Sequence, residues 1–442
     1  MIKRIIKILL ITISILIIAV FYLSYFGIKT DKFNDQITNK VLRINKKINL
    51  NLGDVNYLLD PYNFTINIET KNPEISLVGR SLRIKIIKTN VALKSIIKNQ
   101  ISIDDLQIIT KEIKLNDFIA FVRLFQNSPQ LFVLDTFIRD GFVTVNINLN
   151  FDERGHIKEN YKIEGAVKKA KLNILNQFKL QNLNFNFNID KSSYSLKLLD
   201  TVFNNIKVTS PSIEIEKNKN LFFVNGKFLS KKKSFSKEEL KPIFTNLFDN
   251  IDMQKIIFNS KNNFSFNVNK SLKFDNFKVE SIVDLNQLII DQKNLKLKKY
   301  LPSFDGEIKL TEHKIIINYD KNNFNIKGKG NILLKDKLDN LSYHLIKNKN
   351  KFSFDSRINL KNNSLLIDFL DYKKKEGSNS LILLKGNFKK NNILRFDSIN
   401  LIEKNNQISI KGLVLNKNLK IIDIDNFNIN YKNNKKILNK LN

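Results

Sequence analysis

Apolar and polar residues alternate with a period of two along most of this chain. Clear examples are residues 143–150, 182–189, 264–268, 352–354 and 427–431. Successive side chains of a β-strand point to opposite faces, so this pattern gives one apolar and one polar face. Antiparallel sheets with one wet face have such strands, whereas buried parallel strands are apolar throughout. The sequence therefore predicts a mainly β fold built from a long run of up-and-down antiparallel hairpins.

Short Asn-rich motifs recur between these alternating stretches. Asparagine tolerates the positive φ angles that tight hairpin turns need. Each motif is therefore predicted to be a turn between two strands. The Lys-Asn-Asn copies are at residues 261–263, 321–323, 361–363, 390–392, 404–406 and 432–434, and Asn-Lys-Asn is at 218–220 and 416–418.

The stretch from Ile8 to Phe26 contains no charged residue. As a helix it extends roughly 28 Å, close to the hydrocarbon thickness of a bilayer. Lys3, Arg4 and Lys7 precede it, so the positive-inside rule keeps the N-terminus in the cytoplasm. We expect a single-pass anchor, with the rest of the chain exported. The candidate anchor residues are Ile8, Leu16, Val20 and Phe26.

A cleaved signal peptide is the competing interpretation of this stretch. Its apolar region runs about 7–15 residues and ends at a small-x-small site. Here the run is longer, and it ends in the bulky residues of segment 21–26. Aromatic residues with a polar end are typical of the membrane interface, which favours an uncleaved anchor.

Helical spacing appears in three further places. Residues 29–50 carry apolar residues on one helical face, which predicts an amphipathic juxtamembrane helix. Residues 116–125 have the same periodicity, and 236–239 form a capping box that opens a helical insertion over 236–255. The expected organisation is an anchor over 1–28, the juxtamembrane helix over 29–50, a β segment over 51–235, the insertion, and a second β segment over 256–442.

The chain has a net charge of +32, with 74 Lys and Arg against 42 Asp and Glu. Such a charge prompts three explanations, which are nucleic acid, an anionic membrane surface and genome composition. The lysines lie along the whole length beside asparagines, whereas nucleic-acid proteins concentrate charge on one stripe. AT-rich genome composition explains the lysines best, and we expect no nucleic-acid partner.

Residues able to do chemistry are few. The chain has no cysteine and only three histidines, His156, His313 and His344, which are far apart and in no metal-ligand spacing. Asp104 and Asp105 are neighbours that a strand directs to opposite faces. We therefore expect that the protein is not an enzyme and binds no metal or cofactor, although an active site built from residues scattered along the sequence stays an alternative.

The N-terminal third resembles the AsmA-like proteins of the bacterial envelope, a group that includes AsmA, TamB and YhdP. The order of its parts carries the resemblance: a basic tip, one anchor, an amphipathic helix and then a set of short β motifs. Those motifs are Ile48–Val55, Thr65–Leu77, Ala92–Ile97, Ile101–Ile108 and the glycine-led Asp140–Val143. Each motif is weak alone, and beyond residue 143 the hairpins match the family in pattern only.

The resemblance implies a bridge-like lipid carrier. Its sheet would be elongated and curled into an open hydrophobic groove that carries phospholipid through the periplasm, from the inner to the outer membrane, or assists outer-membrane assembly. Phospholipid acyl chains and the inner membrane are then the expected partners, with an envelope protein at the C-terminal end. The candidate groove residues are Val143, Val145, Ile147, Leu183, Phe185, Phe187, Phe264, Phe266, Phe324, Phe352 and Phe354.

Two other functional classes stay open. The 34 phenylalanines also suit a closed, dry core, which predicts a structural or protein-binding β-solenoid without lipid. An exported hydrolase acting on envelope polymers is the third class. Known AsmA-like proteins are often longer, so this chain is expected to be either a short member with a partner at its free end or a fragment.

Overall fold

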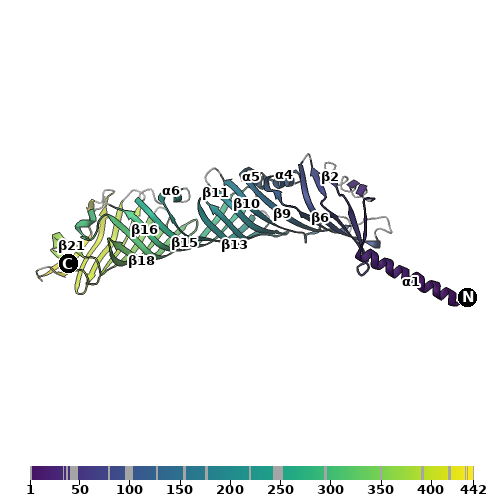
Figure 1. Ribbon diagram of the computed structural model, residues 1–442. Coiled ribbons are helices and arrows are strands. Elements are labelled where there is room, and N and C mark those ends of the chain that lie inside the picture. The colour runs from purple at the N-terminus through teal and green to yellow at the C-terminus, as the bar shows by residue number, and fades with distance from the viewer. Residues whose placement is uncertain are drawn as a thin grey trace. The chain divides into compact units, whose positions relative to one another are not determined.

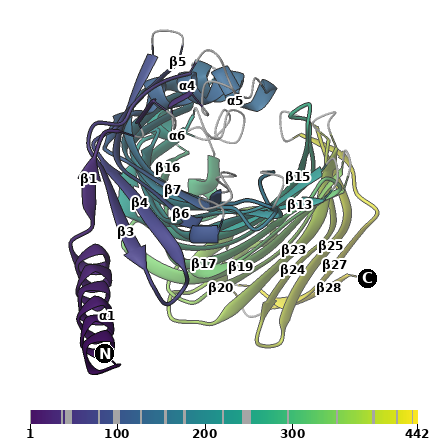
Figure 2. The ribbon, with the colours of Figure 1, turned by 90° about the vertical axis from the view of Figure 1, so that its right-hand side faces the viewer.

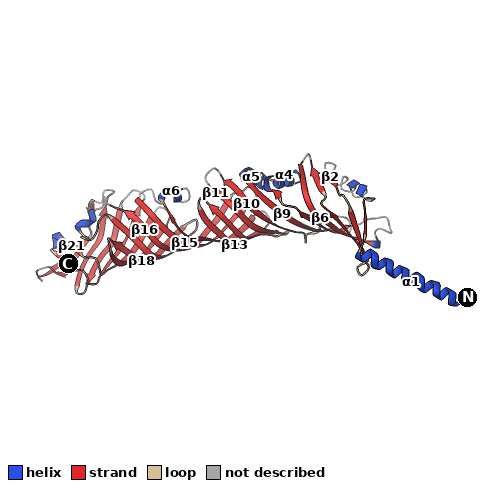
Figure 3. Ribbon diagram, viewed as in Figure 1, coloured by secondary structure: helices blue, strands red, loops and turns tan. Residues whose placement is uncertain are grey.

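The computed structural model describes residues 2–32, 34–35, 38–39, 48–77, 80–94, 103–125, 128–152, 156–174, 178–218, 221–241, 252–292, 296–348, 351–389, 393–416, 420–433, 435 and 437–441. The chain is mainly β with a few helices (Figure 3). The described strands other than β21 and β22 belong to one long antiparallel sheet. This confirms the fold class that alternation predicted, because strands of period two can bury one face and expose the other.

The N-terminal helix α1 spans Ile2–Tyr25 (Figure 1). Its stretch Lys3–Tyr25 is long and apolar enough to cross a membrane, and none of its residues is buried. The length and exposure agree with the single-pass anchor expected from the sequence. Ile8, Leu16 and Val20 lie in the helix, and Phe26 follows its end, with its N–H donating to the Tyr22 carbonyl at 2.8 Å.

The strands form two compact units. Unit 1 comprises residues 1–203, 211–222 and 270–272, and unit 2 comprises 204–210, 223–269 and 273–442. The strands of unit 1 are β1 Ile28–Thr30, β2 Ile48–Asn51, β3 Val55–Asp60, β4 Thr65–Lys71, β5 Glu74–Leu77, β6 Arg80–Ala92, β7 Ile103–Thr110, β8 Ile113–Lys114, β9 Ile138–Asn150, β10 Lys162–Ile174, β11 Phe178–Ile189 and β12 Ser193–Phe203.

Strands β13 Ile206–Asn218 and β14 Leu221–Phe235 have residues in both units. The other strands of unit 2 are β15 Asp252–Asn269, β16 Phe274–Asp291, β17 Glu307–Tyr319, β18 Asn323–Leu334, β19 Lys337–Asn348, β20 Lys351–Leu360, β21 Leu365–Ile367, β22 Tyr372–Lys374, β23 Ser380–Lys389, β24 Leu394–Glu403, β25 Asn406–Leu415, β26 Ile421–Asp423, β27 Asn426–Lys432 and β28 Leu438–Leu441. From β17 to β27 they follow a curve (Figure 2).

Three hairpin turns use the same acidic residue. Asp60 ends β3, and Asp190 and Asp320 directly follow β11 and β17. Each accepts the backbone N–H groups two and three residues ahead. At Asp190 these N···O distances are 2.8 and 2.7 Å, and the second carboxylate oxygen accepts the Ser193 hydroxyl at 2.7 Å. A short polar side chain thus closes the turn on its own backbone.

The predicted turns are partly confirmed. Residues 321–322, 361–363 and 404–405 lie in turns or bends between strands, as expected. The prediction for 261–263 is wrong, because these residues lie inside β15, where the Asn262 side-chain amide donates to the Phe228 carbonyl at 3.2 Å. Residues 219–220, 390–392, 417–418 and 434 lie outside the described residues.

The helices of the body are short. Those whose bounds the structure describes are α4 Leu115–Phe125, α5 Pro129–Phe137, α6 Lys237–Leu240 and the 3-10 turns η1 Lys296–Lys299 and η2 Asp368–Leu370. The capping box at Ser236 and Glu239 is confirmed. Two predicted helices are wrong at their ends: residues 29–30 and 48–50 lie in β1 and β2, and residues 252–255 lie in β15. Most residues between these ends lie outside the described ones.

Candidate functional site: the apolar face of the sheet

Strand register lines up the apolar residues of unit 1. Directly paired residues share a face, so a chain of pairings traces one row across the sheet. We call the row traced here the unit 1 row. Its members are Val55, Thr70, Ile87, Ile108, Ile147, Ile163, Ile189 and Tyr194, from β3, β4, β6, β7 and β9 to β12. Eight strands therefore present one side chain each to the same apolar face.

The opposite face of unit 1 is polar. Lys88 pairs with Glu69 through an N···O distance of 2.9 Å, and the Gln107 side chain donates to Asn146 at 3.1 Å. These four residues lie on β6, β4, β7 and β9, next to members of the unit 1 row. The two faces of one sheet thus differ sharply in polarity, as alternation requires.

Unit 2 also has one apolar and one polar face, and these faces cross more strands than the unit 1 row does. The pairings from β18 to β20 contain no register shift. We define two rows on its apolar face. The rim row is Phe264, Val279, Tyr319, Phe324, Lys347, Phe352, Phe388, Leu394 and Leu415. The middle row is Ile317, Ile326, Leu345, Phe354, Gly386, Phe396 and Leu413.

Much of this apolar face is only partly buried. Ile317, Ile326, Leu345 and Phe354 of the middle row are all half-buried rather than buried. In the rim row, Tyr319 is 43% exposed and Phe388 is 41% exposed. The interior of a filled sandwich would bury such residues almost completely. These rows therefore leave apolar surface in contact with solvent.

Aromatic rings follow one another along the rim row. The Phe277 ring centroid is 6.0 Å from that of Tyr319, which is 6.1 Å from Phe324. Further along, Phe352 and Phe388 stack with centroids 4.7 Å apart. Such pairs add about 0.5–1.5 kcal/mol beyond the area that they bury. They stabilise the hairpins without needing a covering layer.

Glycines let aromatic rings lie flat against the sheet. An added Cβ at Gly328 would come 2.2 Å from the Tyr343 ring, and at Gly386 it would come 2.6 Å from the Phe354 ring. In unit 1, Gly165 has the same relation to Phe187, at 2.4 Å. Each glycine pairs directly with the residue whose ring crosses it. A ring that lies across the neighbouring strand in this way is parallel to the sheet and does not project from its face.

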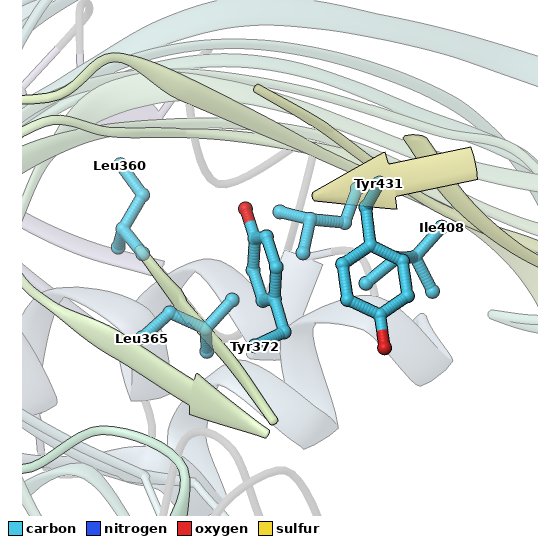
Figure 4. Packing of buried hydrophobic residues seen from close by; sticks show 6 residues of the cluster. Leu360, Leu365, Tyr372, Ile408 and Tyr431 are labelled. Carbon is cyan, nitrogen blue, oxygen red and sulfur yellow. The ribbon is translucent and has the colours of Figure 1, made fainter. Parts of the chain in front are cut away.

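One stretch of the unit 2 face is covered. Residues 361–379, which we call the cap, contain β21, η2 and β22 and connect β20 to β23. Leu365 and Tyr372 of the cap pack with Leu401, Ile408 and Tyr431 of the sheet (Figure 4). The rings of Tyr372 and Tyr431 meet edge to face at 5.5 Å. Here the apolar face has a true core.

Buried hydrogen bonds hold the cap in place. The Tyr372 hydroxyl donates to Glu403 at 2.6 Å, and the Tyr431 hydroxyl donates to the Leu370 carbonyl. The Lys374 ammonium donates to the Lys361 and Asn363 carbonyls at 2.8 and 2.6 Å. Burial, reinforced by the Glu403 carboxylate, raises the pKa of Tyr372, and burial lowers the pKa of Lys374. The Tyr372 hydroxyl and the Lys374 ammonium therefore keep their hydrogen-bond partners only while the cap stays in this position.

Helices lie against the sheet elsewhere. In unit 1, α4 contacts β6, β8 and β9, and its Ile119 and Phe121 are buried. In unit 2, Leu240 of α6 is fully buried with Phe235 and Met253. The covered stretches are thus local, and each depends on an insertion between two strands.

The structure offers little catalytic machinery in the part of the chain that it describes. No group of three or more His, Asp and Glu side chains there is placed to hold a metal ion. His313 is 1% exposed, its Nε2 lies 2.9 Å from the Asn331 carbonyl, and burial lowers its pKa. His156 is exposed beside Asp152, and His344 contacts Asn325. His156 lies in the loop between β9 and β10, whereas His313 lies on β17 and His344 on β19, so the three are not brought together.

The residues predicted for the groove lie on the apolar face. Val143, Val145 and Ile147 are on β9, and their pairings through β10 place Val143 in line with Phe185 and Val145 with Phe187. Val143, Val145 and Leu183 are buried, whereas Ile147, Phe185 and Phe187 are half-buried.

In unit 2, Phe264, Phe324 and Phe352 belong to the rim row and Phe354 to the middle row. The Phe266 ring lies 6.0 Å from that of Phe264. All five of these phenylalanines are half-buried.

Sequence reasoning missed three features of this face. Tyr319 and Phe388 continue the alternation of their strands, so pairing the strands would have found them. Lys347 was missed because lysine is normally assigned to the polar face. The cap was missed because its short strands carry no long alternating run.

Comparisons of this chain with protein-family models, with curated proteins and with solved structures find no match.

Proposed function

We propose that this protein binds phospholipid acyl chains on the apolar face of its sheet, beside the membrane that α1 spans. The observation that supports this proposal is the middle row, in which consecutive strands present half-buried apolar side chains. Each methylene group that leaves water contributes about 0.8 kcal/mol, so an acyl chain along this row has a large driving force. No nucleotide, metal or nucleophile is needed.

The resemblance to AsmA-like proteins extends the proposal to transport. On that basis the body lies in the periplasm, and lipid moves along the row between the inner and outer membranes. A chain of paired strands suits such movement, because every strand offers the acyl chain a similar apolar contact. The polar face, with pairs such as Lys88 and Glu69, stays in water.

Two adjacent isoleucines on β17 provide a matched test. Ile317 belongs to the middle row, whereas Ile316 points to the polar face and is 48% exposed. A photoreactive benzoylphenylalanine at each position, in cells labelled with radioactive phosphorus, reports lipid contact on one face at a time. We expect labelled adducts at position 317 and few at 316. Equal labelling, or adducts with protein alone at 317, would contradict the proposal and favour the protein-binding β-solenoid.

Glutamate substitutions test the energetics at the same pair of positions. A carboxylate on the apolar face must be desolvated when an acyl chain binds, which costs several kcal/mol. We expect Ile317→Glu to lower co-purified phospholipid by about tenfold, since about 1.4 kcal/mol suffices for that change. Ile316→Glu should leave the yield unchanged. Mass spectrometry of lipid extracts from equal amounts of protein measures both.

A further inference from the structure

Lys347 is the one charged member of the rim row. It pairs directly with Phe324 on β18 and with Phe352 on β20, in registers that contain no shift. Its chain neighbour Ile346 points to the other face of the sheet, where it pairs with Ser353. The lysine therefore occupies an apolar-face position between two phenylalanines, and it is exposed.

No carboxylate neutralises this ammonium within the part of the chain that the structure describes. Lys347 forms a cation–π contact instead, with its Nζ 5.2 Å from the Phe352 ring centroid. The nearby β17–β18 turn contains Asp320, whose carboxylate accepts hydrogen bonds from the backbone N–H groups of that turn. Three other charged residues of this face are engaged: Asp339 and Glu403 accept buried hydrogen bonds from the cap, and Lys337 pairs with Glu376.

The surroundings of Lys347 match the boundary between the apolar and polar parts of a lipid. The middle row, next to it on the face, is uncharged and apolar. The exposed rings of Tyr319 and Phe388 lie two strands away on either side in the rim row. Aromatic rings gather at such boundaries in membranes, where one end is dry and the other is wet. A cation there is positioned to meet a phosphate whose acyl chain lies on the middle row.

We propose that Lys347, between Phe324 and Phe352, binds the headgroup phosphate of a phospholipid whose acyl chain lies on the middle row. This inference rests on the proposed function, because the chain and the phosphate belong to one ligand. It adds a preference: lipids with a phosphate bind better than neutral lipids with the same chain.

The test compares lysophosphatidic acid with the monoacylglycerol of the same chain, which differ by the phosphate alone. Binding of each to the full-length protein in nonionic detergent is measured by equilibrium dialysis. A charge-assisted hydrogen bond at an exposed site predicts a preference of about tenfold for the phosphate-bearing lipid. Lys347→Gln should remove this preference, and Lys347→Arg should keep it. Lys327→Gln, on the polar face of β18, should also keep it.

Three outcomes would overturn the inference. Equal affinity of the two lipids for the wild-type protein removes the preference itself. An unchanged preference in Lys347→Gln assigns the phosphate to another residue, and both results leave acyl-chain binding intact. Displacement of the lysolipid by an equal concentration of inorganic phosphate would show a phosphate site without lipid. Failure of both lipids to bind would instead reject the proposed function.

Discussion

The apolar face of unit 2 is closed in one stretch and uncovered in another. Under the cap, Leu360, Leu401 and Ile408 are 3%, 6% and 5% exposed. On the middle row, Ile326 of β18 and Phe354 of β20, the strand that also carries Leu360, remain half-buried. The alternation is the same in both stretches. The pattern therefore decides which side chains share a face, and a separate insertion decides whether that face becomes a core.

The difference also separates two means of holding a sheet together. The covered stretch depends on packing between layers and on buried hydrogen bonds such as Tyr372 to Glu403. The uncovered stretch depends on contacts within one layer, such as the stacked rings of Phe352 and Phe388. Substitutions in the first stretch should therefore be felt more strongly than similar ones in the second.

The largest effect is expected for Tyr372→Ala. The change removes a fully buried ring and leaves Glu403 buried without its phenol donor, which together cost about 4 kcal/mol. Phe354→Ala, in the uncovered stretch, removes a half-buried ring and should cost about 1–2 kcal/mol. Hydrogen exchange of peptides over β21 and β22 should speed up in Tyr372→Ala alone. Unchanged protection there would show that the cap does not depend on this contact.

Sequence alone predicted the faces but not their covers. Residues such as Ile147, Phe187 and Phe354 could be assigned to one face because the period of two is strict and each hairpin pairs with its neighbours. The cap could not be predicted, because Leu365 and Tyr372 come from strands of only three residues and pack on sheet residues that are distant in sequence. Lys347 shows the same limit, since only strand register reveals that this lysine shares a row with phenylalanines.

A second, smaller effect tests how rings are held where no cap exists. In Gly328→Val, the added side chain overlaps the Tyr343 ring, which lies across this position at 2.2 Å from an ideal Cβ. Overpacking of this kind costs about 1–3 kcal/mol. In Gly328→Val with Tyr343→Ala, the ring is absent, so the valine should cost much less than it does in the wild-type background. Urea unfolding of the wild-type protein, the two single variants and the double variant measures this coupling. Additive effects would mean that the ring does not depend on the glycine.

The smallest effect concerns a hairpin turn of unit 1, away from any cover. Hydrogen bonds from the Ser193 hydroxyl and from the backbone N–H of Ser192 lower the pKa of Asp190 to about 2. A lowered pKa means that the folded state binds this proton less readily than the unfolded chain does. The resulting stabilisation is therefore present above the ordinary value of 3.8 and disappears as the pH falls through about 2.

Because solvent screens this turn, the expected contribution is about 1 kcal/mol or less. Asp190→Asn should lower the melting temperature slightly at pH values near 5, and the difference from the wild-type protein should vanish near pH 2. Asp336→Asn, in the β18–β19 turn, removes a carboxylate that accepts no such backbone hydrogen bonds and serves as the matched control. If Asp190→Asn instead speeds up hydrogen exchange in the cap, the stability of this turn and that of the cap are coupled. The covered and uncovered stretches of the apolar face then cannot be treated as independently stabilised.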